Sequence, residues 1–515
     1  MPGHHTDTHF EYLRDDEAFQ ELLRHLAEIA DLQSTAALLG WDEQVMMPGG
    51  GRESRADQKA TLQRLIHERR TSERMGELLE LLADRELPYD SDEASLIRVT
   101  RREYQRLKKV PQALVVELSR AASDGYHCWL KARQDNDFRV FQPALERIYQ
   151  LHRELADALG YEEHPLDALV DAIEPGLRTA DLERIFDALR TELVPMVRTI
   201  SQHLDRVDDS ILRQHFERNK QLLIGRKAVE KIGFDFHRGR QDISVHPFTI
   251  ALSPADVRYT TRVNEHDFAQ CFFACLHEGG HALYAQGIPE RFRRTPLRAG
   301  ASAGFHESQS RLWENLVGRS LQFWEYFLPE MKEVFPTQMK DASAEMIYRA
   351  VNKVQPSLIR VEADEVTYNL HIMLRFELEK AVYDAQLTIA DLADAWRDKM
   401  RSYLGVEPSS DLEGILQDIH WSGRFGACFQ SYTLGNIIAA QLYCKVLEQH
   451  PDLPEYFRKG DFSPLLSWIR EKIHAHGAKF TPEELLLKAT GERLTTRPYL
   501  DYLKTKYSQV YNVEL

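Results

Sequence analysis

Cysteine is scarce in this sequence, and long apolar runs are absent. The five cysteines among 515 residues are odd in number and show no CxxC spacing, which excludes a disulfide-stabilised scaffold and a CxxC metal or redox site. No stretch reaches the roughly 18 apolar residues that a membrane span requires. Residues 1–10 contain no basic segment followed by an apolar one, so we expect no signal peptide. These absences favour a cytoplasmic protein with reduced thiols.

Basic residues are also in deficit, with 65 Lys and Arg against 80 Asp and Glu, a formal net charge of −15. Such a charge argues against binding to nucleic acid or to an anionic membrane, and by itself it would attract basic substrates. Internal repeats, low-complexity tracts and Pro/Ser-rich linkers are missing. We therefore expect a single domain over residues 1–515, with a core large enough to fold without metal or disulfides.

Apolar residues recur every three or four positions through most of the chain, which is the pattern of amphipathic helices. This pattern predicts helices over 52–70, 91–110, 179–204, 305–327, 357–383 and 430–448. Near the C-terminus, Thr481, Pro482 and Glu484 form a capping-box pattern that opens a further helix. The sequence thus predicts a mainly α-helical fold.

One interval, residues 242–263, breaks the helical pattern. It is rich in β-branched residues and has a turn around Ser253-Pro254, which predicts a small antiparallel β-sheet. In its second strand, Asp256, Arg258 and Thr260 alternate with apolar residues, so their side chains share one face. That face requires either solvent or a function.

The motif HEGGH follows this segment at residues 277–281. On a helix, His277 and His281 lie one turn apart on the same face, where both imidazoles can bind a tetrahedral Zn²⁺. Glu278 lies about one-third of a turn away, where it can contact a metal-bound water rather than the metal. The sequence therefore predicts a metal-dependent hydrolase centre on this helix.

The helix that carries HEGGH has recognisable ends and two internal glycines. Asn264 is the expected N-cap, and Gly287 is the expected residue just past the C-terminus. Gly279 and Gly280 cost about 2 kcal/mol of helix propensity relative to two alanines. We expect them to allow close approach by another backbone or a substrate, with tight helix packing as the alternative.

Glu307, in the motif HESQ at 306–309, is the candidate third metal ligand. The motif follows a run of small residues at 299–304. A glutamate on a following helix would complete a two-histidine, one-carboxylate site and leave the fourth position for water. The alternative is a carboxylate that only stabilises the N-terminus of its helix.

Short motifs follow one another in order over most of the chain. They are Trp41-Asp42 with Met47-Pro48-Gly49-Gly50 and Arg55, His246-Pro247-Phe248, Asp256-Val257-Arg258-Tyr259-Thr260, HEGGH, HESQ, Ile359-Arg360-Val361-Glu362-Ala363-Asp364, Gly414-Ile415-Leu416-Gln417-Asp418-Ile419-His420-Trp421 and Tyr432-Thr433-Leu434-Gly435-Asn436. In this order they resemble the thermostable carboxypeptidase (carboxypeptidase Taq) family of metallopeptidases. The sequence departs from the family at Ala427-Cys428-Phe429-Gln430, where the family pattern has an aromatic-Phe-Pro run.

The resemblance implies a mostly helical molecule with a deep substrate groove and a metal at its floor. It implies release of single C-terminal residues from peptides that have a free C-terminus, with broad specificity, and a homodimer is common in the family. By this match His277, His281 and Glu307 are the metal ligands and Glu278 is the catalytic base. The metal would be Zn²⁺ or Co²⁺, one per chain, because both accept these ligand types.

Peptide hydrolysis also needs hydrogen-bond donors that stabilise the oxyanion of the tetrahedral intermediate. His420 and Tyr432 lie on either side of a glycine-containing loop near the C-terminal motifs. We take these two residues as the candidate donors.

A carboxypeptidase must in addition bind the free α-carboxylate of its substrate. Arginine suits this because its planar guanidinium binds a carboxylate with two hydrogen bonds. Arg258 and Arg360 are the candidates. Each has a structural alternative, an ion pair with Asp256 for Arg258 and with Asp364 for Arg360.

Two other functions remain as alternatives. An endo-acting or dipeptide-releasing metallo-oligopeptidase would share the HExxH motif, and it would cleave C-terminally amidated peptides. A helical binding protein with a catalytically silent HExxH would bind no stoichiometric metal and would lose no function on Glu278→Gln.

Overall fold

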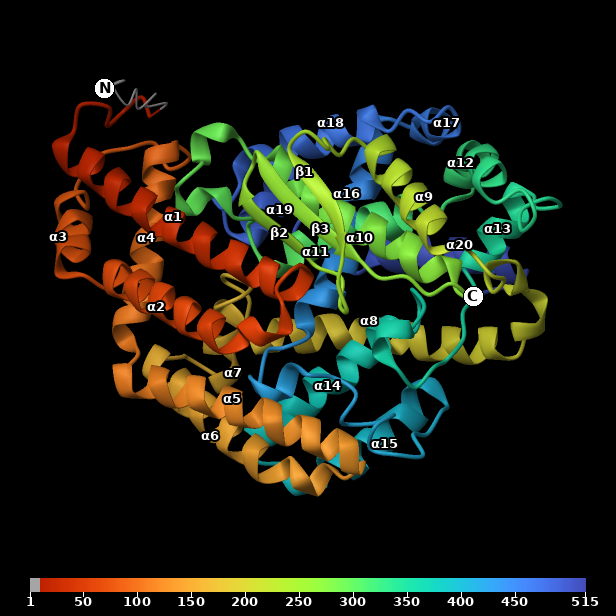
Figure 1. Ribbon diagram of the computed structural model, residues 1–515, viewed down its shortest axis with the longest axis horizontal. Coiled ribbons are helices and arrows are strands. Elements are labelled where there is room, and N and C mark those ends of the chain that lie inside the picture. The colour runs from red at the N-terminus through yellow and green to blue at the C-terminus, as the bar shows by residue number, and fades with distance from the viewer. Residues whose placement is uncertain (1–9) are drawn as a thin grey trace.

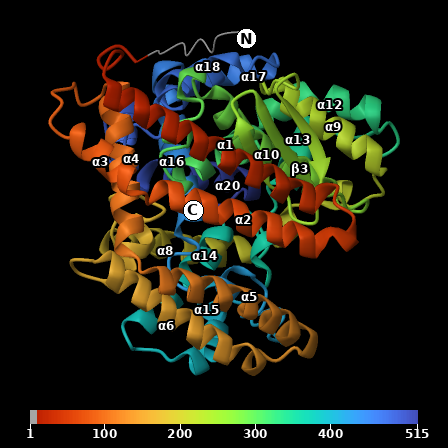
Figure 2. The same ribbon diagram turned by 60° about the vertical axis from the view of Figure 1, so that its left-hand side comes forward.

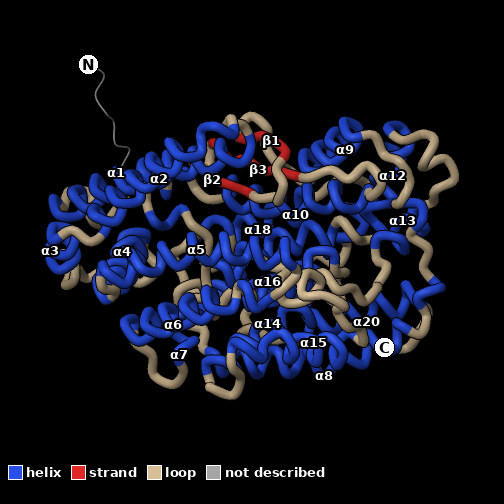
Figure 3. The backbone as a smooth tube through the Cα atoms, turned by 60° about the horizontal axis from the view of Figure 1, so that its bottom comes forward, coloured by secondary structure: helices blue, strands red, loops and turns tan. Residues whose placement is uncertain are grey.

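Helices form most of the chain, as the apolar periodicity predicts (Figures 1 and 3). The computed structural model describes residues 10–515, so most of the segment for which we expect no signal peptide lies outside the described residues. The helices before the sheet are α1 (Glu17–Val45), α2 (Arg52–Arg70), α3 (Glu73–Leu81), α4 (Asp92–Lys109), α5 (Gln112–Asp135), α6 (Gln142–Leu159), α7 (Pro165–Asp171), α8 (Thr179–Ser201) and α9 (Arg218–Lys231).

The remaining helices follow the sheet and build the C-terminal half. They are α10 (Phe268–Gly287), α11 (Ala303–Arg311), α12 (Leu321–Val334), α13 (Ala344–Val351), α14 (Tyr368–Tyr383), α15 (Leu392–Leu404), α16 (Gln430–Gln449), α17 (Leu453–Arg458), α18 (Ser463–Lys472), α19 (Pro482–Thr490) and α20 (Arg497–Tyr511). Buried apolar side chains from both halves form one cluster that extends from Phe10 to Tyr511. Within residues 10–515, no helix is both long and apolar enough to cross a membrane.

Four of the six predicted helices are confirmed by α2, α4, α8 and α16, and two are wrong in extent. The interval 305–327 is interrupted, because α11 passes into a π-helical stretch at Leu312–Val317 and Ser320 caps a separate helix, α12. The interval 357–383 has a 3-10 turn at Arg360–Glu362 and becomes α-helical only at Tyr368. There the side chain of Asp364 accepts hydrogen bonds from the backbone N–H groups of Val366 and Thr367, and this local capping replaces helical hydrogen bonds.

Helix ends were predicted with mixed success. The capping box at Thr481 is confirmed. Asn264 is not the N-cap of α10; Asp267 is, and its side chain accepts a hydrogen bond from the backbone N–H of Gln270. Gly287 is the last residue of α10 rather than the residue after it, and a Cβ there would lie 2.1 Å from Nδ1 of His474. Gly287 is thus explained by packing and not by a left-handed turn.

The predicted sheet exists but is mixed rather than wholly antiparallel. Its strands β1 (Gly239–Ile243), β2 (Thr249–Ser253) and β3 (Asp256–Thr261) lie in the order β1-β3-β2. β2 pairs with β3 in antiparallel fashion, whereas β1 pairs with β3 in parallel. The chain reverses both after β1 and after β2, so β3 runs in the direction of β1, and it lies between the other two strands.

The sheet lies between α10 and the N-terminal helix α1 (Figures 1 and 2). Val257 and Tyr259 of β3 are completely buried, as the alternation predicts. On the polar side, the guanidinium of Arg258 stacks over the ring of Trp41 from α1 at 4.6 Å. The polar face of β3 is therefore covered by α1 and is not simply solvated.

Close packing explains both internal glycines of α10. A Cβ on Gly279 would lie 2.9 Å from Val229 of α9, and a Cβ on Gly280 would lie 2.5 Å from the carbonyl oxygen of Gln309 in α11. Both contacts are tight helix packing, which was the alternative, and only at Gly280 is the approaching group another backbone. On its other side α11 contacts α16, where a Cβ on Gly435 would lie 2.5 Å from Cγ of Glu307.

We expect Gly280→Ala to lower the free energy of unfolding by about 1–3 kcal/mol, even though alanine improves helix propensity by about 1 kcal/mol. The reason is that the backbone of α11 cannot move aside as the end of a flexible side chain can. Urea unfolding followed by circular dichroism measures the change.

Gly40→Ala in α1 is the matched control, because a Cβ there would meet no atom within 4 Å. It should raise the free energy of unfolding by about 0.5–1 kcal/mol. If both variants were stabilised alike, the packing role of Gly280 would be wrong.

Candidate active site

The structure brings the three candidate metal ligands together. His277 and His281 project from one face of α10, and Glu307 projects toward them from α11. Their ligand atoms all lie within 4.8 Å of one another. Oε2 of Glu307 is 3.8 Å from Nε2 of His277 and 3.5 Å from Nε2 of His281. The HEGGH spacing and the glutamate on the next long helix thus converge on one point.

A network of charged side chains holds these candidate ligands. Nδ1 of His277 lies 2.8 Å from Oε2 of Glu314, which the π-helical stretch after α11 carries. Nε of Arg311 donates to Oε1 of Glu307 at 2.7 Å, so the other carboxylate oxygen, Oε2, faces the histidines. Burial alone would raise the pKa of Glu307, but Arg311 and His277 outweigh it and hold this pKa well below its usual range.

His281 is oriented by a second histidine. Its Nδ1 lies 2.6 Å from Nδ1 of His306, and the imidazole of His306 is mostly buried and lies beside Tyr284. Burial lowers the pKa of His306 to about 3, so this ring is neutral at pH 7. A neutral His306 can accept the proton on Nδ1 of His281, which leaves Nε2 of His281 unprotonated toward Glu307.

Glu278, the candidate base, lies one residue after His277 and is 7% exposed. Its Oε2 accepts a hydrogen bond of 2.7 Å from the hydroxyl of Thr249 in β2. The same hydroxyl lies 2.9 Å from the backbone carbonyl of Glu278. The β-sheet thus fixes the orientation of this carboxylate.

His420 and Tyr432 lie against each other, with 3.2 Å between Nε2 and Oη. Burial lowers the pKa of His420 to about 4 and raises the pKa of Tyr432, so both are neutral at pH 7. The loop between them contains Ala427 in the left-handed region, with φ of 55°, next to Gly426 with φ of 103°. This is the segment that departs from the family pattern, and it leads Tyr432 into the first turn of α16.

Arg360 is buried and already bonded. Its Nε and Nη2 donate to Oδ1 of Asp418 at 3.0 and 2.7 Å, and its Nη1 donates to Tyr368. The alternative prediction, an ion pair between Arg360 and Asp364, is wrong, because the carboxylate of Asp364 instead accepts hydrogen bonds from backbone N–H groups just before α14. Arg375 donates to the second oxygen of Asp418 at 2.7 Å. Two guanidinium groups therefore share one carboxylate, and the cluster keeps a net positive charge 5.3 Å from the ring of Tyr432.

Arg258 forms the expected ion pair with Asp256, with a closest distance of 2.8 Å. It is held between this carboxylate and Trp41. Tyr259 points into the core beneath the sheet, and its hydroxyl donates to Gln241. His246 is exposed, its Nδ1 lies 2.8 Å from the carbonyl oxygen of Pro247, and its own carbonyl accepts a hydrogen bond from the hydroxyl of Ser244.

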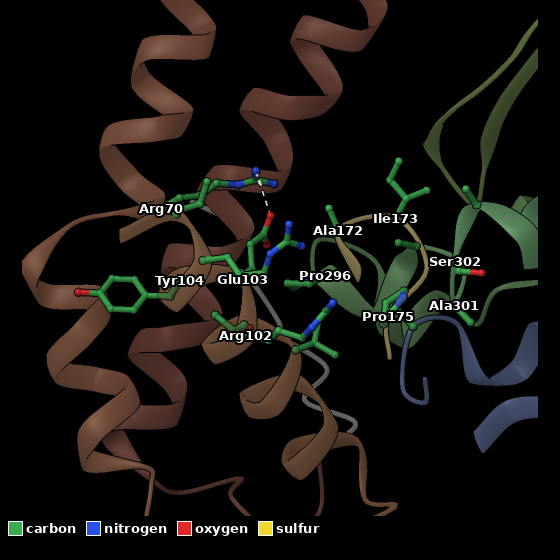
Figure 4. Close-up of a pocket in the computed structure, with 18 of the residues that line it drawn as sticks. Arg70, Arg102, Glu103, Tyr104, Ala172, Ile173, Pro175, Pro296, Ala301 and Ser302 are labelled. Atoms are coloured by element: carbon green, nitrogen blue, oxygen red, sulfur yellow. Dashed lines mark ion pairs between the residues drawn. The ribbon is translucent and has the colours of Figure 1, made fainter. Parts of the chain in front are cut away.

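A cavity of about 1450 Å³ opens from this site toward the N-terminal helices. At its inner end it is lined by His281, Glu307 and Tyr432. Figure 4 shows Arg70, Arg102 and Glu103 on one side of it, with Ala301 and Ser302 across from them. The inner end of this groove thus meets the candidate metal ligands.

His306, Arg311 and Glu314 support the candidate ligands and were not predicted from the sequence. Arg311 and Glu314 follow Glu307 at spacings of four and seven, which put all three on one helical face. That spacing could have identified them. The contact between Thr249 and Glu278 joins different elements and has no local signal.

Comparisons with known proteins find relatives over nearly the whole chain. A family model described as carboxypeptidase Taq (M32) metallopeptidase matches residues 21–507. Thermostable carboxypeptidase 1 of Thermus thermophilus is 44% identical over 506 residues, covering 96% of this chain and 99% of its own. Carboxypeptidase 1 of Bacillus subtilis is 38% identical over 496 residues, covering 96% and 98%. A crystal structure of the M32 carboxypeptidase from Deinococcus radiodurans R1 matches with a TM-score of 0.94 at 41% identity, covering 97% of this chain and 100% of that chain.

This chain belongs to the carboxypeptidase Taq (M32) family. The resemblance read from its ordered motifs is confirmed, and the protein is a metallocarboxypeptidase. Membership of the M32 family implies a divalent metal.

The candidate ligands fit such an ion. Zinc ligands at about 2.1 Å in a tetrahedron lie roughly 3.4 Å from one another. The separations of 3.5 and 3.8 Å between Glu307 and the two histidines are close to that value. A histidine whose second ring nitrogen lies against a carboxylate, as that of His277 does against Glu314, is also usual for metal-binding histidines.

We expect Glu314→Gln to weaken metal affinity by about 10–100-fold, because the amide no longer stabilises His277 as a carboxylate does. Competition for Zn²⁺ between the protein and a chelator measures this. Glu333→Gln, at an exposed position on α12, is the control and should bind as the wild type does. Unchanged affinity in Glu314→Gln would contradict the supporting role of this carboxylate.

Proposed function

We propose that this metallocarboxypeptidase releases single residues from the C-terminus of peptides, with broad specificity for the residue released. The observation that carries the proposal is the convergence of His277, His281 and Glu307 within 4.8 Å, with Glu278 adjacent on the same helix. The proposed metal is Zn²⁺, one per chain, with Co²⁺ as the alternative because it accepts the same ligands.

Glu278 is our candidate general base. A metal bound by the three ligands supplies Lewis acidity, which polarises the scissile carbonyl and makes a water molecule more acidic. Oε2 of Glu278 is held by Thr249, whereas Oε1 has no hydrogen-bond partner between residues 10 and 515. Oε1 can therefore take a proton from the attacking water, and Glu278 then returns this proton to the leaving amine.

Tyr432 and His420 are our candidates for stabilising the oxyanion. Tyr432 stays protonated at pH 7 because burial raises its pKa. If neutral His420 donates its Nε2 proton to the oxygen of Tyr432, the phenolic proton remains available to the substrate oxyanion. One such donor is typically worth about 3 kcal/mol in the transition state.

Arg360 is our first candidate for the α-carboxylate of the substrate, and Arg258 is the second. The cluster of Arg360, Arg375 and Asp418 has one more positive than negative charge, and it lies beside Tyr432. Arg258 is neutralised by Asp256 in a one-to-one pair. Excess positive charge favours an added anion, which supports Arg360.

We also propose that the chain forms a homodimer and acts in the cytoplasm. The family resemblance supports the dimer. The second proposal is supported by its five cysteines, which are all free thiols.

With metal-loaded protein, a peptide with a free C-terminus should lose one residue at a time, and its C-terminal amide should be resistant. Glu278→Gln should lower kcat by about 10²–10⁴-fold, because a positioned general base contributes about this much. Mass spectrometry of both peptides over time follows the products.

Two further samples make this experiment decisive. Removal of the metal with a chelator should abolish cleavage, and readdition should restore it. Internal cleavage of both peptides would favour an endo-acting oligopeptidase instead. A fully active Glu278→Gln would exclude Glu278 as the base.

Arg360→Gln should reduce kcat/KM for the free-acid peptide by about 100-fold, close to 3 kcal/mol, as expected for a lost charged hydrogen bond. It should also narrow the difference in kcat/KM between the free-acid peptide and its C-terminal amide. Arg258→Gln is the matched comparison and should change that difference less. If Arg258→Gln changed that difference more than Arg360→Gln did, the α-carboxylate would be assigned to Arg258.

A further inference from the structure

The groove that reaches the metal ligands is strongly basic, although the whole chain carries a net charge of −15. Seven arginine and lysine side chains line it, against only two carboxylates, Glu103 and Glu307. Glu307 is already bonded to Arg311, which does not line the groove. The sign of the charge inside the groove is thus opposite to that of the protein as a whole.

Three of these basic side chains are neutralised locally. Arg70 pairs with Glu103 at 3.1 Å, Arg102 pairs with Asp171 at 2.8 Å, and Lys479 pairs with Asp92. These pairs hold the wall of the groove together. They leave little charge to attract a ligand.

The other four arginines have no carboxylate partner within 4.0 Å among residues 10–515. Arg98, Arg298 and Arg424 donate to backbone carbonyls, those of Lys479, Leu252 and Leu169. Arg106 forms no hydrogen bond or ion pair with any described residue. Both side chains are partly buried, and burial lowers the pKa of Arg106 and of Arg298 because it disfavours their charged forms.

The position of this cavity indicates which part of a substrate it holds. A carboxypeptidase has one residue on the C-terminal side of the scissile bond and all the others on the N-terminal side. The cavity of about 1450 Å³ is larger than the roughly 300–1,000 Å³ of a site for a drug-sized ligand. Neither Arg258 nor Arg360, the candidates for the α-carboxylate, lines it. The cavity therefore suits the upstream part of the peptide.

We propose that this groove selects peptides that carry aspartate or glutamate side chains upstream of the bond that is cut. The inference rests on the proposed carboxypeptidase function and names its substrate class. Guanidinium groups bind carboxylates with two parallel hydrogen bonds. Arg106, on α4, and Arg424, just before α16, line the same groove, and an acidic side chain that enters it can bind a guanidinium group that has no carboxylate partner within residues 10–515.

The test compares two acetylated hexapeptides with identical last two residues and either three glutamates or three glutamines upstream. The glutamate peptide should have a kcat/KM about tenfold higher, mainly through KM, as expected for one charged hydrogen bond. Arg106→Gln should reduce this preference at least threefold. Because Arg106 has no partner in the described part of the chain, the variant should fold, which its thermal unfolding temperature checks.

Lys108→Gln is the matched control, because it removes the same charge from the same helix at an exposed position outside the cavity. It should keep the wild-type preference. The second measurement repeats the comparison for the wild type in 1 M NaCl. The ratio of kcat/KM between the glutamate and glutamine peptides should fall, since the Debye length shortens from about 10 Å at 0.1 M salt to about 3 Å at 1 M.

Each outcome separates the inference from the proposed function. Equal cleavage of both hexapeptides would overturn the acidic-substrate inference and leave the carboxypeptidase function intact. Cleavage of neither, with metal bound, would defeat the proposed function itself. If Arg106→Gln changed the discrimination between free acid and amide rather than between glutamate and glutamine, Arg106 would bind the α-carboxylate and the inference would be wrong.

Discussion

The close packing of α11 between α10 and α16 is the constraint on which the candidate active site depends. A side chain at Gly280 would collide with the backbone of α11, and one at Gly435 would collide with Glu307 itself. The first contact brings α11 within backbone distance of the histidine helix α10, and the second packs α16 against the other side of α11. Only at this distance can a side chain as short as glutamate reach the same point as two imidazoles from α10.

Charge then orients what the packing brings together. Arg311 holds one oxygen of Glu307, and Glu314 holds Nδ1 of His277. Both supporting residues belong to the same continuous segment as Glu307, so one segment supplies a ligand and the groups that orient two of the ligands. His306 does the same for His281. The orientation of the candidate ligands is therefore set largely by hydrogen bonds and ion pairs within the chain.

The sequence predicted those features that depend on local spacing. HEGGH, the helix over α2 and the β-segment are recognisable because a period of 3.6 or 2 is visible within a few residues. Long-range partners were not predictable. Arg360 pairs with Asp418, which is 58 residues away, and not with Asp364, which is one helical turn away but caps α14. The parallel pairing of β1 required knowledge of strand order. The basic groove combines residues from α4 with residues near 298 and 424, which are far apart in the sequence. The net negative charge of the whole chain pointed to the opposite sign for its substrate.

The left-handed backbone conformation of Ala427 destabilises the folded state locally. A non-glycine residue in the left-handed region costs about 1–2 kcal/mol, and at φ of 55° Ala427 is such a residue. It persists because Phe425, Ala427 and Phe429 are all buried and leave the segment no other conformation. The strained turn directly precedes α16 and sets the direction in which Tyr432 enters that helix. Conformational energy is thus stored within a few residues of Tyr432. A relaxed and more mobile turn would let the phenol of Tyr432 move away from His420.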